Sequence, residues 1–316
     1  MGELHKFIFD GLPVRGQLVR LTDAWQELLA RRAANTETGA YPAPVAGVLG
    51  ELAAVAVLMQ GSIKFDGALV LQIQGDGPLK LAVAEVQADL RLRATATLTG
   101  PVAPGLPLSD LVNAHGQGRC AITLDPRAPG QHPYQGVVPL VDAQGRRLER
   151  VGAMVEHYMR QSEQLDTALV LAADDRVAAG LLLQRLPAPA QAGTAEEGED
   201  DFARLSLLAR SLRHEELLDL DADTVLRRLF WDERLLRLDR LQGARGPRFA
   251  CSCSRARMAA MLTGLGRNEV ESVLDERGQV EVGCDFCGRQ ERFDAVDVAR
   301  LFTPAEQRVP QPPAVQ

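Results

Sequence analysis

Apolar residues recur at two different spacings over residues 1–187, and this mixture predicts a unit built from both helices and strands. The apolar residues of 14–34 follow helical spacing, and the nearly unbroken apolar run of 44–59 predicts a second, buried helix. Alternation with a period of two indicates an antiparallel meander. We expect its strands at 68–74, 79–86, 90–98 and 119–124, a further helix at 151–165, and short strands at 169–171 and 180–184.

The pattern changes after residue 187. Residues 187–201 are rich in proline, alanine, glycine and acidic residues, a composition typical of a linker. Beyond this stretch, apolar residues return at helical spacing in two places, the second after the helix-start pair Asp223-Thr224. The sequence therefore predicts two amphipathic helices in the middle of the chain. Their apolar stripes consist of Phe202, Leu205, Leu208, Ala209 and Leu212, and of Val225, Leu226, Leu229 and Phe230.

Composition and charge restrict the class of protein. Of the 316 residues, 46% are hydrophobic and 24% are charged, which is typical of a folded globular protein and excludes disorder throughout the chain. The formal net charge of −7 gives no general attraction to nucleic acid or to an anionic membrane. The sequence starts without the apolar stretch of a signal peptide, and no run reaches the ~18–20 apolar residues of a membrane helix. We therefore expect a cytoplasmic protein with neither a membrane nor a nucleic acid as partner.

Four of the five cysteines are concentrated in one C-terminal stretch, as the pairs Cys251-Ser-Cys253 and Cys284-Asp-Phe-Cys287. Two short pairs, each brought together by its own turn, are the usual way for a chain to place four sulfur atoms around Zn²⁺. The spacing predicts one zinc ion per chain in the reduced protein. Because the surrounding unit is small, the metal would serve as much of its core, and structural zinc contributes ~10–16 kcal/mol to the folding of such units.

These observations predict an α+β fold class with three parts: an N-terminal antiparallel-sheet domain with helices, a helical middle linker, and a small C-terminal Cys₄ zinc domain. Within the zinc domain, Ser254 is expected to cap a helix, and residues 279–283 are expected to form a strand that enters the second cysteine pair. The boundaries expected from the sequence are 1–187, 188–244 and 245–303, followed by a disordered tail at 304–316.

The four clustered cysteines are also compatible with roles other than a regulatory zinc site. Four buried, unligated cysteines would account for the residue type but not for the ligand spacing, whereas a purely structural zinc ribbon would account for both. A thioredoxin-like redox pair would require a βαβ context that the pattern lacks. A zinc–thiolate cluster is also a latent redox switch, because neighbouring thiolates form disulfides when oxidised. The five histidines show no catalytic or metal-binding spacing, so we expect a protein that is not an enzyme.

Several short blocks accompany the cysteine pairs along nearly the whole chain. They are Val14-Arg15-Gly16, Tyr41-Pro42-x-Pro44-Val45, Lys64-Phe65-Asp66-Gly67, Gln74-Gly75-Asp76-Gly77-Pro78, Tyr134-Gln135-Gly136-Val137-Val138 and Ser162-Glu163-Gln164-Leu165. Together with Cys251-Ser-Cys-Ser254 and Cys284-Asp-Phe-Cys-Gly288, and in the same order, they resemble the redox-regulated heat-shock protein 33 family, the 33 kDa chaperonins.

The resemblance implies an ATP-independent holdase, a chaperone that binds unfolded client proteins under oxidative stress and forms a homodimer on activation. The reduced, zinc-bound form would be inactive, and oxidation of the four cysteines would release zinc and activate the protein. The disulfides implied are Cys251–Cys253 and Cys284–Cys287. Under this hypothesis, the candidate client-binding residues are Phe202, Leu205, Leu208, Leu212, Leu229 and Phe230.

The sequence departs from the family pattern at three residues. Asp166 stands where the family often has proline, and Glu291 stands where an aromatic residue commonly follows the second cysteine pair. Loss of aromatic packing at 291 would make the zinc domain easier to unfold. Cys120 matches no family cysteine, and its place in a predicted strand indicates a small core residue rather than a redox participant.

The alternative function is that of a zinc-ribbon protein that binds nucleic acid. Its interface would be the basic run of residues 227–257, which holds nine arginines and three acidic residues. The acidic residues on and around the second cysteine pair argue against this function, as does the overall negative charge. Those acidic residues are Glu281, Asp285 and Glu291.

Overall fold

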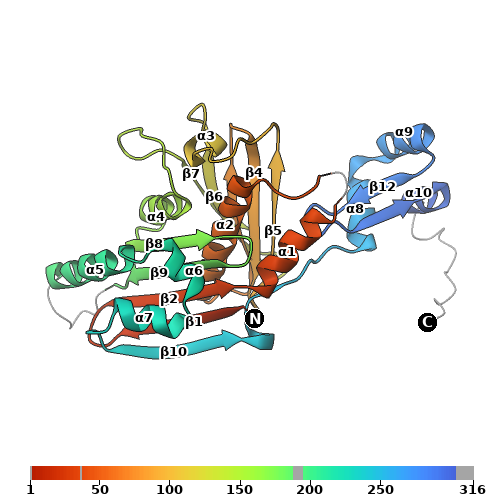
Figure 1. The fold of residues 1–316 in the computed structure, drawn as a ribbon. Coiled ribbons are helices and arrows are strands. Elements are labelled where there is room, and N and C mark those ends of the chain that lie inside the picture. Colours follow the sequence, from red (N-terminus) through yellow and green to blue (C-terminus); the bar gives the residue numbers. More distant parts are fainter. Residues whose placement is uncertain (1, 36–37, 188–194, 304–316) are drawn as a thin grey trace. The chain divides into compact units, whose positions relative to one another are not determined.

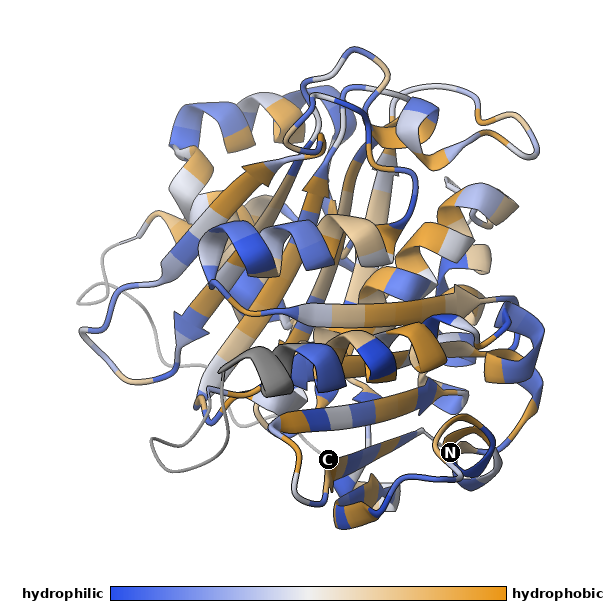
Figure 2. Cartoon of the chain, turned by 90° about the vertical axis from the view of Figure 1, so that its left-hand side faces the viewer, coloured by the Kyte–Doolittle hydropathy of each residue, from blue (hydrophilic) through white to orange (hydrophobic). Residues whose placement is uncertain are grey.

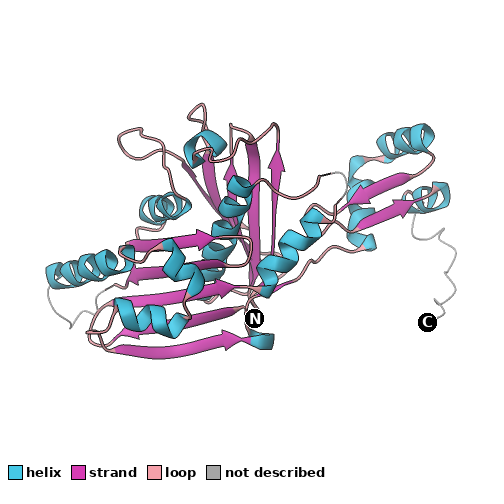
Figure 3. Cartoon of the chain, in the orientation of Figure 1, coloured by secondary structure: helices cyan, strands magenta, loops and turns pink. Residues whose placement is uncertain are grey.

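The computed structural model describes residues 2–35, 38–187 and 195–303. They belong to two compact units, Met1–Ala250 and Cys251–Gln316. Both units combine helices with strands, so the predicted α+β class is confirmed (Figure 3).

The first unit contains a five-stranded antiparallel sheet, sheet A, with the strand order β10-β1-β2-β9-β8 (Figure 1). Strands β1 and β2 come from the N-terminal end of the chain, β8 and β9 come from its middle, and β10 follows the middle helices. The strands are β1 (Glu3–Phe9), β2 (Val14–Leu21), β8 (Thr167–Ala173), β9 (Ala178–Arg185) and β10 (Leu235–Gln242).

The same unit contains a six-stranded sheet, sheet B, with the order β11-β5-β4-β3-β6-β7, which is antiparallel except at its β11–β5 edge. The β3–β4 hairpin requires glycine at its turn, because a Cβ on Gly75 would lie 2.0 Å from the carbonyl oxygen of Leu79. The strands are β3 (Gly67–Gln74), β4 (Leu79–Gln87), β5 (Arg91–Leu98), β6 (Arg119–Pro126), β7 (Tyr134–Pro139) and β11 (Arg248–Phe249).

Helix α2 (Ala43–Ser62) is the central element of the core, because it contacts strands of both sheets. It is long and apolar enough to span a membrane, but 72% of its most apolar window is buried inside the protein. An apolar helix enclosed in this way is a core helix. The helices α1 (Asp23–Ala33), α3 (Leu108–Val112) and α4 (Val151–Ser162) complete this part of the unit.

Three helices from the middle of the chain cover the face of sheet A that α2 does not contact. Figure 2 shows mixed polar and apolar residues along α5, beside the strands of sheet A. The apolar residues of these helices join Phe7, Phe9, Leu18 and Leu181 in a second buried cluster. Strands β1, β2, β8 and β9 of sheet A are therefore largely buried on both faces. The covering helices are α5 (Ala195–Arg210), α6 (His214–Asp219) and α7 (Ala222–Leu229).

The second unit is small. Its apolar core consists of seven buried side chains among the described residues: Met258, Leu262, Val270, Val280, Val282, Phe293 and Val298. As predicted, Ser254 caps the first helix, since its hydroxyl oxygen accepts a hydrogen bond from the Arg257 N–H at 3.2 Å. The elements are α8 (Arg255–Leu265), α9 (Arg267–Arg277), β12 (Val280–Gly283), β13 (Gln290–Phe293) and α10 (Ala295–Leu301).

Two predictions from the sequence, one from the apolar pattern and one from composition, are wrong. The helix predicted over 14–34 is strand β2 followed by the shorter helix α1. Because β2 lies between two strands and is covered on both faces, its apolar residues need not alternate. The linker predicted over 187–201 is helical from Ala195 onward, and residues 188–194 lie outside the described residues, as does the predicted tail at 304–316. The middle region, predicted to be helical, also contains strand β10.

A cavity of about 300 Å³ in the first unit is lined by Glu51, a partly buried carboxyl group on α2. Burial raises the pKa of Glu51 to about 7, although the positive charge of Arg150 partly opposes this shift. Glu149 and His214 also line the cavity. Glu51 is therefore a group whose ionisation destabilises the fold.

This pKa predicts that the free energy of unfolding falls as the pH rises from 4.5 to about 7, because the folded chain then retains a proton that the unfolded chain has lost. Replacement Glu51→Gln should remove this dependence and stabilise the protein by about 1–3 kcal/mol at pH 8, with little effect at pH 5. Urea unfolding at both pH values measures the effect. An equal pH dependence in the two proteins would contradict the proposed effect of burial.

Candidate metal centre

Four cysteine thiols converge from two loops of the second unit. Cys251 and Cys253 lie in the segment directly before α8, and Cys284 and Cys287 lie in the turn between β12 and β13. This turn is tight, because the N–H groups of Cys287 and Gly288 both donate to the carbonyl oxygen of Cys284, at 3.3 and 2.8 Å. Gly288 has a φ of 70°, the left-handed conformation that glycine adopts without strain.

The four sulfur atoms lie within 4.8 Å of one another. The sulfur of Cys251 is 3.6 Å from that of Cys284, and the sulfur of Cys253 is 3.3 Å from that of Cys287. A tetrahedral zinc site with Zn–S bonds of about 2.3 Å places its sulfur atoms about 3.8 Å apart. The two separations lie slightly below that value and all four sulfur atoms lie within 4.8 Å, so a small adjustment fits the four residues to a tetrahedral metal ion.

The electrostatics of the thiols also fit a metal. Burial, together with hydrogen bonds to the neighbouring thiols, raises the pKa of Cys253 well above its ordinary value. Burial also raises the pKa of Cys284, although backbone N–H groups of Phe286 and Cys287 act in the opposite direction. Four thiols this close ionise together only when a cation compensates their charge. The cluster can therefore hold a metal ion, and its all-sulfur donor set is one that Zn²⁺ accepts.

Glu291 forms two ion pairs close to the cysteine cluster. Its carboxylate lies 3.2 Å from the Arg255 guanidinium and 2.6 Å from that of Arg289. The hydrogen bond from Arg255 is the largest of the effects that lower the pKa of Glu291. Arg255 also pairs with Asp297 at 2.6 Å and stacks over the Phe293 ring. These contacts tie β13 and α10 to the start of α8, next to Cys253.

The fifth cysteine is not part of this cluster. Cys120 lies in β6 with no exposed surface, and burial raises the pKa of its thiol to about 12. A thiol that is both buried and protonated is a poor nucleophile and a poor metal ligand. Its position in the core of a strand is the one that the sequence predicts.

The six candidate client-binding residues all lie in the first unit, against sheet A. Leu205, Leu212 and Phe230 are buried in the cluster beneath the middle helices, and Phe9 and Phe230 meet edge to face at 5.0 Å. The other three are partly buried against the same cluster: Phe202, Leu208 and Leu229. In this state, these residues are therefore packing contacts rather than an open binding surface.

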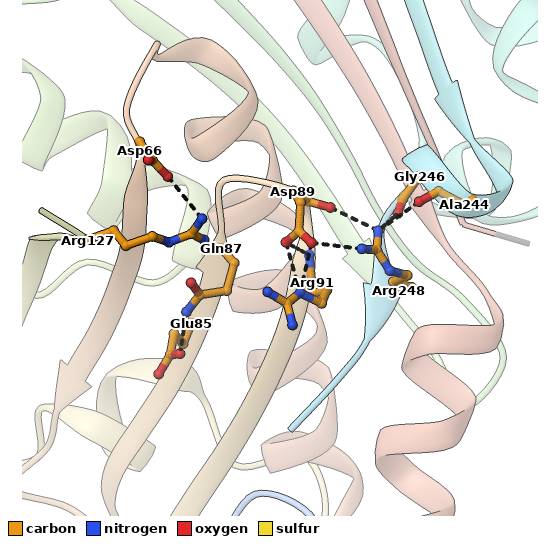
Figure 4. A network of polar contacts seen from close by, with 9 residues as sticks. All are labelled: Asp66, Glu85, Gln87, Asp89, Arg91, Arg127, Ala244, Gly246 and Arg248. Carbon is orange, nitrogen blue, oxygen red and sulfur yellow. Dashed lines mark hydrogen bonds and ion pairs between the residues drawn. The ribbon is translucent and has the colours of Figure 1, made fainter. Parts of the chain in front are cut away.

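Sequence reasoning missed a polar anchor at the end of the middle region. The Arg248 guanidinium pairs with the Asp89 carboxylate at 2.8 Å and donates to the carbonyl oxygens of Asp89 and Ala244, each at 2.9 Å (Figure 4). Arg91 holds the same carboxylate from the other side. The anchor fixes β11 to sheet B just before Cys251. In the sequence, Arg248 is one arginine of a basic run and gives no distinguishing signal.

Fold and site together define a protein with a two-sheet α+β core, a helical cover over one sheet, and a separate small unit that presents four converging thiols. The sequence profile of the Hsp33 protein family matches residues 2–294. The chain belongs to this family.

Relatives that match over nearly their whole length support this assignment. The chain is 47% identical over 300 residues to the 33 kDa chaperonin of Chromobacterium violaceum, with 95% of this chain and 93% of the relative covered. It is 40% identical to the 33 kDa chaperonin of Methylobacillus flagellatus, with coverages of 95% and 94%. The crystal structure of a 33 kDa chaperonin from Thermotoga maritima has the same fold, with a TM-score of 0.72 at 20% identity over 95% of this chain and 97% of that one. Family and relatives therefore make the protein a chaperone, a role that is not enzymatic.

The geometry predicts that the reduced protein binds one equivalent of zinc and that each of the four cysteines is required. Replacement Cys284→Ser should abolish stoichiometric zinc binding, because three thiolates leave the tetrahedral site incomplete. Replacement Cys120→Ser is the matched control and should leave the zinc content at one equivalent. Elemental analysis of both purified variants measures this. Unchanged zinc content in Cys284→Ser would contradict the assignment.

Proposed function

We propose that the protein is a redox-regulated, ATP-independent holdase that is inactive while Cys251, Cys253, Cys284 and Cys287 hold one zinc ion. Oxidation of these cysteines under oxidative stress would release the metal and activate binding of unfolded client proteins. The observation that carries the proposal is the approach of four sulfur atoms to within 4.8 Å in a unit with so small an apolar core. Zinc–thiolate bonds would supply ~10–16 kcal/mol to such a unit, so their loss would unfold it.

The proposed disulfides are Cys251–Cys253 and Cys284–Cys287. All four thiols are within reach of one another in the folded unit, and the contacts at 3.6 and 3.3 Å join cysteines of different pairs. Once the unit loosens, the chain keeps only the members of each pair close, and closing a short ring costs less entropy than bridging residues 254–283. Each disulfide forms from two thiolates with loss of two electrons to an oxidant such as hypochlorous acid.

The middle region would act as the cover that oxidation removes. Its helices α6 and α7 are only six and eight residues long, so they depend on packing against sheet A for their stability. The anchor at Arg248 is separated from Cys251 by only two residues, so unfolding beyond Ala250 would leave β11 as a fraying end. Departure of the cover would expose the apolar residues of sheet A, including Phe7 and Phe9, to client proteins and to a second copy in an active homodimer.

Internal ion pairs favour this proposal over the nucleic-acid-binding alternative. Much of the basic run of residues 227–257 is neutralised within the chain, so its arginines do not form a free basic surface. The pairs are Arg228–Glu216, Arg234–Asp10, Arg237–Asp223, Arg240–Glu3, Arg248–Asp89 and Arg255–Asp297. A zinc–thiolate switch also requires a compartment in which thiols stay reduced, so we propose a cytoplasmic location.

Peptide mapping after treatment with hypochlorous acid tests the switch. We expect one disulfide within each pair, Cys251–Cys253 and Cys284–Cys287, and release of one equivalent of zinc. The oxidised protein should suppress the aggregation of a thermally unfolded test protein, whereas the reduced zinc-loaded protein should not. Mainly cross-pair disulfides would refute the proposed pairing, and zinc retained after oxidation would refute the switch.

Weakening the cover should activate the chaperone without oxidant. The double replacement Leu205→Ser and Leu212→Ser puts hydroxyls into the buried cluster, at a cost of roughly 2–4 kcal/mol per site. We expect partial suppression of aggregation by this reduced, zinc-loaded variant. Leu207→Ser is the matched control, because Leu207 lies on the same helix but is 73% exposed. Equal behaviour of both variants would show that the cover does not restrain activity.

A further inference from the structure

Strand β10 occupies the edge of sheet A, paired with β1 in an antiparallel register from Glu3↔Gln242 to Phe9↔Leu235. Unlike the other strands of the sheet, it is mostly exposed. Only Leu235 and Leu241 are partly buried, Leu235 against the cluster beneath the middle helices and Leu241 against the core around α2. The side chains of β10 therefore add little apolar packing to its attachment.

Ion pairs add little more. Arg237 pairs with Asp223 and Arg240 pairs with Glu3, both at 2.9 Å and both with arginine side chains about half exposed. Exposed pairs of this kind contribute ~0–1 kcal/mol each. The remaining attachment of β10 is the ladder of main-chain hydrogen bonds to β1. Such a ladder has no strong preference for sequence, so another extended chain can form it equally well.

The partner strand β1 is fixed much more firmly. Leu4, Phe7 and Phe9 have 0–1% of their surface exposed, and β2 pairs with β1 on its other side. When the middle region leaves, β1 would stay in the sheet and present a row of unpaired N–H and C=O groups. Three charged residues of β10, Arg237, Asp239 and Arg240, disfavour pairing of another strand with its outer edge. The second half of β1 has instead the apolar sequence Phe7-Ile8-Phe9. The β1 edge, once uncovered, therefore pairs with another extended chain more readily than the outer edge of β10 does.

We propose that the β1 edge is a strand-addition site, at which an extended segment of an unfolded client takes the place of β10. This inference rests on the proposed holdase function. The site fits a segment with apolar residues opposite Leu4 and Phe9, where β10 places Leu241 and Leu235. It also favours basic residues at both ends of the segment, because Glu3 and Asp10 meet Arg240 and Arg234 there. Sequence-tolerant main-chain pairing suits a chaperone that must hold many different clients.

Backbone N-methylation distinguishes strand addition from binding by side chains alone. The probe is a fluorescent peptide with the sequence of residues 235–242, added to the oxidised, metal-free full-length chain. One peptide carries N-methyl groups at Arg237 and Arg240, which pair with Phe7 and His5 of β1. The other peptide carries N-methyl groups at Leu236 and Leu241, which pair with Ile8 and Leu4. The register shifts between Lys6 and Phe7, so the first pair of methyl groups lies opposite odd-numbered residues of β1 and the second pair opposite even-numbered ones. Because ladder hydrogen bonds alternate along β1, only one of these peptides has methyl groups that face β1. The other peptide is the matched control.

We expect one methylated peptide to lose at least about tenfold in affinity, while the other binds within about threefold of the unmethylated peptide. Amide exchange should slow across residues 3–9 when the unmethylated peptide binds. If both methylated peptides bind like the parent while the oxidised chain still holds clients, strand addition is wrong and the holdase function stands. If the oxidised chain is a dimer and its amides at residues 3–9 exchange slowly without any peptide, the β1 edge pairs with a second copy of the chain and not with a client. Failure of the oxidised chain to hold any client would overturn the proposed function itself.

Discussion

Contact between the middle helices and sheet A decides which surfaces of the first unit are accessible. Leu205, Leu212 and Phe230 bury Phe7 and Phe9, and the Arg20 guanidinium donates to the carbonyl oxygens of Leu217 and Leu218, at 2.5 and 2.8 Å. The contact is mainly apolar, so it keeps water and other chains away from this face of the sheet while it lasts. However, two of the helices that make this contact are short, and the strand that follows them, β10, is mostly exposed. The contact can therefore be lost without disrupting α2 or the core of sheet B, whose buried residues form a separate apolar cluster around α2.

The second unit, unlike the first, has too small an apolar core to account for its stability. With seven buried apolar side chains among its described residues, it is too small to fold well by burial alone. The four converging thiols would supply the missing stability only while they are reduced and hold a metal. Glu291, which is expected to weaken this unit, joins Arg255 and Arg289 in a partly exposed ion-pair network. Such pairs contribute little individually, so a bound metal would remain the main source of stability in this unit.

The candidate metal site could be located from the sequence because the spacing of the cysteines within each pair depends only on a local turn. Ser254 as a helix cap and Gly288 as a turn residue with positive φ were predictable for the same reason. The buried helix at 43–62 was equally predictable, since its apolar run is continuous. Strand β2 was misassigned as helix because it is covered on both faces and shows no alternation. Strand β10 and the Arg248 anchor were missed because both depend on distant partners, β1 and Asp89, that local patterns do not encode.

Amide hydrogen exchange, compared between the reduced zinc-loaded chain and the oxidised metal-free chain, shows whether the middle region leaves sheet A on activation. We expect protection to fall by about a hundredfold or more across residues 200–250, which include the middle helices and β10, while strands β3–β6 keep theirs. The same oxidised sample must suppress aggregation of a test protein. If α5, α6, α7 and β10 kept full protection in an oxidised chain that holds clients, removal of the cover would not be the route to activity.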